Sequence, residues 1–390
     1  MSRIYSKIPS VAPDYSGAAS VLHDMGGLIV FCDVGGCYGN YAAFDEPRMG
    51  FAKKLFTLGI READLVMGVD RVAKKKIVES FRKLGGKFVA LIGTPSTTLT
   101  GMDFRGLCAE LQEELGVPAF FADTSGLFSY ERGQEKIYQA LAAYAQNIAV
   151  EEPADVHVIG ATPLDTWDYG QQDQFRKLLK DCGAKRPLIW GDSNTMDVLG
   201  SLEASKLNIA VSVSGIRVVQ NLNKKYGTPY RIGFPAGNQQ LAEWEKEITE
   251  LLSGEFRENA EFSRSVSDKI SDKRVLIVGE QVASNALRAM LQTEFFCKEA
   301  HVASFFTMDK DQMKDGDFFA VTESFYVDEL QKRPAYDIVI GDDFLTQAVP
   351  YQAELIRIPS IAISGLVFIR QSPVLFGEKG TMYFQQCVNV

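Results

Sequence analysis

Short apolar segments that end in glycine recur along the whole chain. They end at Gly68, Gly160, Gly279 and Gly341, and each leads toward a segment expected to be helical. Alternation of apolar strands with helices is typical of a parallel sheet. A chain of 390 residues is also too long for one compact core. The repetition therefore predicts an α/β fold made of three Rossmann-like parallel-sheet domains.

Changes in composition predict where these units begin and end. Glu151–Asp155 is polar and contains a proline, as expected of a linker. Within the units, apolar spacing predicts a helix over Met49–Leu58 and a strand over Ser360–Ser364. The predicted segments are a first Rossmann-like domain (1–150), a second (151–235), a charged crossing helix (236–264), and a third domain with the C-terminal segment (265–390).

Overall composition narrows the class of protein. Hydrophobic residues make up 46% and charged residues 23%, as in an ordinary globular protein. The net charge of −9 argues against a nucleic-acid partner. Apolar runs stay well short of the roughly 20 residues that span a bilayer, and the N-terminal residues lack the apolar centre of a signal peptide. We therefore expect a cytoplasmic protein without a membrane partner.

Nucleotide binding is also unexpected. The residues after Gly279 lack the G-x-G-x-x-G spacing of a dinucleotide site, and the sequence has no G-x-x-x-x-G-K-[ST] loop. These loops bind phosphates through glycine-rich backbone, so their absence argues against ATP or NAD. We expect that this chain itself binds no nucleotide.

A glycine-rich turn with two cysteines follows the first predicted strand. Leu28–Phe31 is apolar and stops at Cys32, and the turn continues through Gly36 to Cys37. Glycine allows close approach to a bound group, and ligands bind at strand ends in open α/β sheets. A Cys-x4-Cys pair can supply part of an iron–sulfur or zinc site. Free cysteines are also common packing residues, so the spacing alone leaves both interpretations open.

Several segments match one family pattern in the same order. Asp33–Cys37 is similar to a strand followed by Gly-Pro-x-Gly-Cys, with Val34 roughly where proline is usual. Together with that turn, the pattern resembles nitrogenase component 1 and its relatives, including the light-independent tetrapyrrole reductases. The resemblance covers nearly the whole chain and implies a nitrogenase component 1-like fold. The other matching segments are Asp64–Gly68 with Lys74–Ile77, Thr94–Asp103, Asn221–Tyr230, Lys273–Val275 and Gly377–Gly380.

Departures from the family pattern affect the implied cofactors. In the family, three cysteines per subunit bind an iron–sulfur cluster at the subunit interface. Only Cys37 matches one of them, because Thr94–Ser96 and the region near Pro13 contain no cysteine. The ligands of the nitrogenase cofactor are absent too, since their places fall near Val211 and about Phe376. The resemblance is therefore closer to the cofactor-free tetrapyrrole reductases than to true nitrogenase.

The resemblance implies a cluster shared between two chains. If Cys32 and Cys37 both face the interface, two chains supply four thiolates, enough for one [4Fe–4S] cluster. Gly36 belongs to the same cofactor-binding turn. The resemblance also makes Asp33 a candidate for a substitute cluster ligand, because an aspartate is a cluster ligand in one branch of the family. The implied partner subunit is an identical chain or a related one.

The implied function is that of a nitrogenase-like reductase subunit. A separate ATP-dependent iron–sulfur reductase would supply low-potential electrons, which the cluster passes to an unidentified substrate. Such a reduction needs proton donors, and His23, Asp24 and Asp33 are the candidate catalytic residues nearest to the cysteine turn in the sequence. Two alternatives remain open: a non-catalytic scaffold or partner subunit for cluster or cofactor assembly in the same fold, and a metal-free α/β binding protein.

Overall fold

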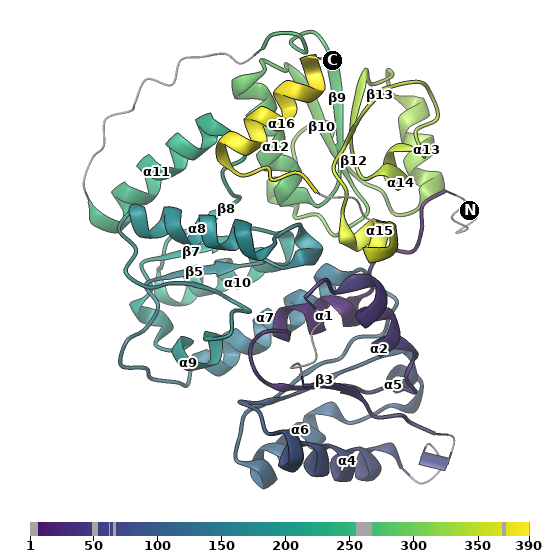
Figure 1. Ribbon diagram of the computed structural model, residues 1–390, viewed down its shortest axis with the longest axis vertical. Helices are drawn as coiled ribbons and strands as arrows, with labels where there is room; N and C mark the ends of the chain where they lie inside the picture. Colours follow the sequence, from purple (N-terminus) through teal and green to yellow (C-terminus); the bar gives the residue numbers. More distant parts are fainter. Residues whose placement is uncertain are drawn as a thin grey trace.

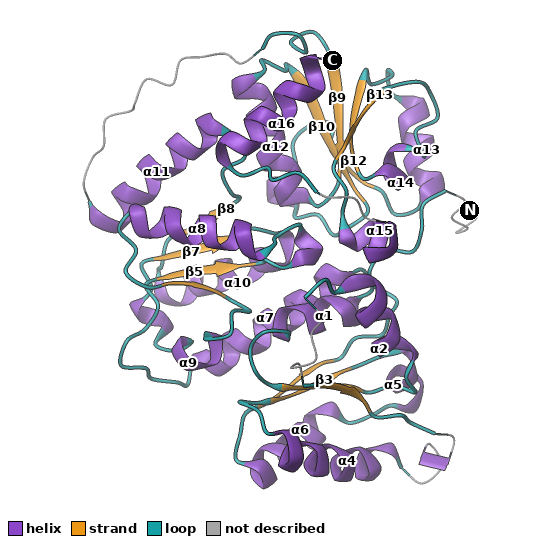
Figure 2. Cartoon of the chain, viewed as in Figure 1, coloured by secondary structure: helices purple, strands orange, loops and turns teal. Residues whose placement is uncertain are grey.

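Three parallel sheets organise the protein. The computed structural model describes residues 7–48, 54–61, 63–64, 68–254, 267–368 and 372–389. The sheets appear as separate groups of strands with helices between them (Figures 1 and 2). This arrangement confirms the predicted α/β fold. None of the described helices has both the length and the apolar character needed to cross a membrane.

The first unit contains the cysteine turn. Its strand order is β2-β1-β3-β4, and alternate residues of β1 face opposite sides of the sheet. Ile29 and Phe31 pack toward α1 and α7, whereas Leu28 and Val30 pack toward α4 and α6. The elements are α1 (Asp14–Leu22), β1 (Leu28–Phe31), α2 (Gly36–Asn40), a π-helical turn (Tyr41–Asp45), β2 (Leu55–Thr57), α4 (Val69–Leu84), β3 (Val89–Ile92), α5 (Pro95–Thr100), α6 (Phe104–Leu115), β4 (Ala119–Ala122) and α7 (Tyr130–Ala145).

The second unit lies against α7 through its helix α10 (Figure 1). Its strand order is β6-β5-β7-β8. The strands are short, and β5 and β7 are buried along their whole length. The elements are β5 (Val156–Ile159), the 3-10 turn η2 (Pro163–Asp165), α8 (Tyr169–Asp181), β6 (Pro187–Ile189), α9 (Thr195–Val198), the 3-10 turn η3 (Leu202–Ala204), β7 (Leu207–Ala210), α10 (Val213–Tyr226) and β8 (Tyr230–Ile232).

The third unit has the sheet order β11-β10-β9-β12-β13. The helix α11 (Asn238–Ser253) precedes it in the chain and packs against α12 and α16. The remaining elements are β9 (Arg274–Val278), α12 (Gln281–Glu294), β10 (Glu299–Ser304), the 3-10 turn η4 (Lys310–Gln312), β11 (Phe318–Phe319), α13 (Glu323–Lys332), β12 (Ile338–Gly341), α14 (Asp343–Thr346), β13 (Glu354–Arg357), α15 (Ile361–Phe368) and α16 (Gly377–Asn389).

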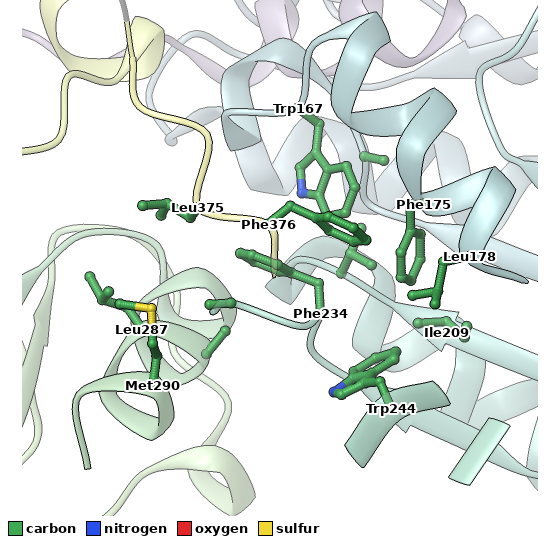
Figure 3. Close-up of a cluster of buried hydrophobic side chains, with 14 of the residues drawn as sticks. Trp167, Phe175, Leu178, Ile209, Phe234, Trp244, Leu287, Met290, Leu375 and Phe376 are labelled. Atoms are coloured by element: carbon green, nitrogen blue, oxygen red, sulfur yellow. The ribbon is translucent and has the colours of Figure 1, made fainter. Parts of the chain in front are cut away.

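An aromatic cluster joins the second and third units (Figure 3). Trp167 packs against Phe175 and Phe234 with ring-centre distances of 5.5 and 5.3 Å. Phe376, from the segment before α16, lies 6.0 Å from Phe175. Buried aromatic pairs combine large apolar area with favourable edge-to-face geometry. Phe376 therefore has a packing role here.

Two local predictions were wrong. Leu55–Thr57, inside the segment predicted as a helix, forms the edge strand β2 because it pairs in parallel with β1. Residues 49–53 of that segment lie outside the described residues. The predicted strand at Ser360–Ser364 is instead helical in α15, and the edge strand is the preceding segment Glu354–Arg357. A short apolar run does not by itself distinguish a strand from a buried helix.

The domain boundaries remain a prediction. Strands of the three sheets fall within 28–122, 156–232 and 274–357. The crossing helix was predicted over 236–264, and the described part of it is α11, which ends at Ser253 with Gly254 in a left-handed conformation. Residues 255–266 lie outside the described part of the chain.

Candidate functional site

The cysteine turn is held by the side chain of Asp33. The Asp33 carboxylate is fully buried and accepts hydrogen bonds from the backbone N–H groups of Cys37 (2.8 Å) and Tyr38 (3.3 Å). Its other oxygen accepts a short hydrogen bond from the Thr57 hydroxyl. Gly35 precedes α2 with φ of 131°, a conformation that favours glycine. Asp33 is thus placed to fix the turn and the start of α2.

The two cysteines lie on opposite faces of the first sheet. Cys32 is fully buried in the core toward α4 and α6, where its Sγ lies 3.8 Å from the carbonyl oxygen of Val30. Cys37 is half-buried and packs against the core toward α1 and α7. The pKa of the Cys37 thiol is raised to about 11, mainly by burial and secondly by the charge of the nearby Asp33 carboxylate. The structure therefore does not bring the two thiols together.

A complete iron–sulfur site is not formed by one chain. Among the described residues, no group of three or more His, Cys, Asp or Glu side chains is arranged to hold a metal ion. A [4Fe–4S] cluster takes four ligands. The donor set of this chain alone therefore does not fit the cluster, and the half-buried Cys37 is a single thiol of the type that ligates iron.

Exposed apolar side chains surround the cysteine turn at the carboxyl edge of the first sheet. Val34 follows β1, Leu99 lies in α5 after β3, and Leu127 and Phe128 follow β4, with between 59% and 88% of each residue exposed. We call Val34, Cys37, Leu99, Leu127 and Phe128 the cysteine-edge surface. Large exposed apolar side chains that gather in one area mark interaction surfaces. The surface thus has the character of a contact with another molecule.

His23 and Asp24 belong to a buried polar network. His23 Nδ1 lies 2.8 Å from the Tyr41 hydroxyl, and its Nε2 lies 3.2 Å from the Arg48 carbonyl oxygen. Arg48 binds both carboxylate oxygens of Glu46 at 2.7 Å and reaches Asp24 at 3.1 Å. Although burial opposes ionisation, Arg48 holds the pKa of Glu46 below its usual value. This network is separate from the Asp33 turn, so the three predicted proton donors do not form one cluster.

A groove and a smaller cavity lie where the units meet. The groove is about 410 Å³ and is lined by Arg48 of the first unit, Trp167 and Tyr169 of the second, and Pro373 of the third. The neighbouring cavity is about 50 Å³. Thr166 lines both spaces. Ligand pockets commonly measure about 300–1,000 Å³, so the groove has the size of a ligand site and the cavity has room only for a small group.

Three carboxyl groups line the small cavity, and none of them was among the site residues predicted from the sequence. They belong to Asp165, Glu280 and Asp342. Asp165 comes after β5 of the second sheet, whereas Glu280 and Asp342 come after β9 and β12, which are neighbours in the third sheet. Strand ends are where ligands bind in α/β sheets, so the glycines that end these strands were a signal that could have identified the region.

A sequence comparison identifies the family. Residues 14–358 match the family described as nitrogenase component 1 type oxidoreductase. The chain belongs to this family. The match confirms the resemblance and places the chain in a family of oxidoreductases.

Relatives within the nitrogenase component 1 family have different roles. The chain is 24% identical over 274 residues to the light-independent protochlorophyllide reductase subunit N of Synechococcus elongatus, covering 61% of this chain and 56% of that protein. It is 25% identical to the nitrogenase molybdenum-iron protein alpha chain of Azospirillum brasilense, covering 64% and 52%. It is 26% identical to the cofactor biosynthesis protein NifE of Bradyrhizobium diazoefficiens, covering 50% and 36%. The aligned part thus spans about half or less of each relative.

A solved structure supports the fold of the family. The structure titled "Nitrogenase Cp1 at pH 6.5" superimposes with a TM-score of 0.69 at 14% identity. The match covers 100% of this chain and 93% of the other. At this identity the comparison supports the nitrogenase component 1 fold of the chain and nothing about its substrate.

Proposed function

We propose that the chain is a cytoplasmic subunit of a nitrogenase-like reductase, in which Cys37 is one ligand of an iron–sulfur cluster at an interface with a partner subunit. The observation that carries this proposal is the position of Cys37. Its half-buried thiol lies in a glycine-rich turn, among the exposed apolar side chains of the cysteine-edge surface. A partner seated on this surface would bury those side chains and bring further ligands to Cys37.

The ligand count favours a related partner over an identical one. Cys32 is buried on the opposite face of the sheet, so a symmetric pair would offer only the two Cys37 thiolates at its interface. Four ligands are needed. A partner chain that supplies three ligands would complete the cluster, and the proposed assembly is therefore a heterodimer.

A bound cluster would supply one-electron chemistry at low potential. An ATP-dependent iron–sulfur reductase is the proposed electron source, as the family resemblance implies. The residues of this chain would position the substrate, and the groove lined by Arg48, Trp167 and Tyr169 has sufficient volume and lies where the three units meet. The reductase roles printed for the relatives of Synechococcus elongatus and Azospirillum brasilense are consistent with such an activity.

Metal content tests the proposal. The tagged full-length chain is purified without oxygen from its native cells, and iron, sulfide and co-purifying polypeptides are quantified. We expect about four irons per copy of this chain together with a second polypeptide, since one cluster would belong to each heterodimer. The Cys37→Ser variant is expected to lose most of the iron.

The matched control is Cys32→Ser, which removes a thiol from the same turn but from the opposite face of the sheet. It should retain the iron of the wild-type chain. A value of about two irons per chain without a second polypeptide would support a symmetric dimer instead. Wild-type protein without iron, or equal loss in both variants, would refute the role proposed for Cys37.

A second candidate function is a non-catalytic scaffold or partner subunit for cluster or cofactor assembly. The incomplete ligand set of the described chain favours it, and a relative in Bradyrhizobium diazoefficiens is named as a cofactor biosynthesis protein. A scaffold releases its cluster to an acceptor protein, whereas a reductase subunit retains it during turnover. Transfer of radiolabelled iron to an added apo-protein distinguishes the two functions.

A further inference from the structure

Buried carboxyl groups from all three units meet near the small cavity. Asp165 is buried and accepts hydrogen bonds from the Tyr130 hydroxyl (3.1 Å), the Gln134 amide (2.8 Å) and the Thr162 hydroxyl (2.8 Å). Tyr130 and Gln134 belong to α7 of the first unit, whereas Asp165 belongs to the second. Asp165 therefore lies at the contact between these two units.

Glu280 approaches the same place from the third unit. It precedes α12 and accepts hydrogen bonds from the backbone N–H groups of Ala283 in its own helix and Val213 in the second unit, both at 2.8 Å. Asp165 and Glu280 both line the cavity, and so does Asp342. Glu131 of α7 is close enough to disfavour ionisation of Glu280. The cluster thus consists of Glu131, Asp165, Glu280 and Asp342, with Tyr130 among them.

The described lining of the cavity offers no positive charge to balance this cluster. Lysine, arginine and histidine are absent from the described residues that line it. Buried carboxylates of like charge without a cation favour the protonated form. Protons held by the carboxyl groups would reduce the repulsion between them.

The direction of the pKa shifts agrees with this geometry. The pKa of Asp165 is raised to about 8, mainly by burial and secondly by the charge of Glu280. Burial also raises the pKa of Glu280 to about 7, with Glu131 as a further cause. Hydrogen bonds to both carboxylates act in the opposite direction and are outweighed. Proton donors work best when their pKa is close to the working pH.

We propose that Asp165 and Glu280 donate protons to a small unsaturated group of the substrate held in the cavity. The proposal rests on the reductase function proposed above. Adding two electrons and two protons to a double bond breaks its π bond and forms two new bonds to hydrogen. The external iron–sulfur reductase supplies the electrons one at a time, and the acid forms of Asp165 and Glu280 supply one proton each. The two carboxylates then recover protons from water.

The groove lies beside the cavity. Thr166 directly follows Asp165 and lines both the cavity and the groove. Its φ of 68° is unusual for a residue other than glycine. Such backbone conformations often occur at functional sites. The body of a substrate would occupy the groove, and only the group to be reduced would enter the cavity.

Infrared spectroscopy tests the proton donors without a known substrate. The full-length chain is titrated between about pH 5 and about pH 9, and the carbonyl bands of protonated carboxylic acids are followed. We expect the bands of Asp165 and Glu280 to disappear near neutral pH and to shift in heavy water, beside a band of Asp45, whose pKa burial raises to about 6. Asp165→Asn and Glu280→Gln should each remove one band. The melting temperature of the wild-type protein should fall as the pH rises, because a carboxyl group whose pKa is raised by folding loses its stabilising contribution as the pH passes the folded pKa. In each variant this fall should be smaller.

Glu294→Gln is the matched control. Glu294 is another buried carboxyl whose oxygens accept hydrogen bonds from Gln239 and Thr381, but it does not line the cavity. Both neutral-pH bands should remain in this variant. The proposal is overturned if the wild-type protein has no carboxyl band titrating near neutral pH, if the two variants retain both bands, or if heavy water does not shift them. Because this readout needs no iron, it is independent of the metal test above.

Discussion

Replacing Gly133 by alanine is expected to destabilise the protein by about 3 kcal/mol or more, since overpacking against a rigid backbone is among the costly substitutions. A Cβ atom at Gly133 in α7 would overlap the carbonyl oxygen of Asp14 in α1. The two helices approach closely at a second point, where a Cβ atom at Gly17 of α1 would overlap the carbonyl oxygen of Tyr130 in α7. The two helix backbones are therefore in direct contact.

Neither helix can move away at low cost. Asp14 also accepts hydrogen bonds from the backbone N–H groups of Ser125 and Gly126, at 3.0 and 2.7 Å. Tyr130 in α7 donates to Asp165 in the second unit. Displacing one helix from the other would strain these contacts. Urea denaturation at neutral pH measures the loss as a lower midpoint with an unchanged slope.

Gly39→Ala in the short helix α2 is the control for this prediction. A Cβ atom at Gly39 would meet nothing within 4 Å, and alanine is a better helix former than glycine. The free energy of unfolding of the Gly39→Ala variant should stay within about 0.5 kcal/mol of the wild-type value. If Gly133→Ala lost less than about 1 kcal/mol, the helices could separate more easily than their contacts indicate.

The sequence predicted the parallel-sheet fold because the apolar strands are short, buried and bounded by glycine. The local mistakes arose where pairing with a neighbour decides the structure. Leu55–Thr57 has no strong strand pattern of its own and becomes β2 by pairing with β1. Ile361–Phe368 is mostly apolar, and its helical state depends on packing against the first unit and η2. Periodicity contains no information on such tertiary contacts.

The candidate site was harder to predict than the fold. The position of Cys32 follows from strand periodicity, because Leu28, Val30 and Cys32 alternate onto the same face of β1. Strand periodicity is therefore a sequence signal that places Cys32 in the core, away from the half-buried Cys37. For the carboxyl cluster, the glycines that end the strands indicate the region but not which carboxyl groups meet there. Asp165 and Glu280 lie far apart in the sequence and meet only because the second and third units pack together.

Replacing Arg48 by methionine is expected to cost about 3–5 kcal/mol at neutral pH, because removing one partner of a buried ion pair leaves an uncompensated charge. The side chain of Arg48 is 9% exposed and that of Glu46 is fully buried. Arg48 also reaches Asp24 and the carbonyl oxygen of Ser20. The variant therefore loses several contacts of the network that holds His23, and urea denaturation measures the loss.

The loss in free energy of unfolding caused by Arg48→Met should become smaller as the pH falls. Arg48 holds the pKa of Glu46 below its usual value despite burial, so this group stabilises the wild-type fold above an unfolded pKa of about 4.3. That contribution is lost as the pH falls through the folded pKa. The variant lacks this contribution at every pH, and its Glu46, without the guanidinium, takes up a proton more readily. The two proteins should therefore converge in stability in acid.

A double variant separates the unpaired charge from the lost packing. Glu46→Gln together with Arg48→Met removes both charges, so it should be more stable at neutral pH than Arg48→Met alone. Arg82→Met, at an exposed pair with Glu114, should change stability by less than about 0.5 kcal/mol. If the double variant were no more stable than Arg48→Met, the loss would come from packing and hydrogen bonds, and the buried charge of Glu46 would not be its cause.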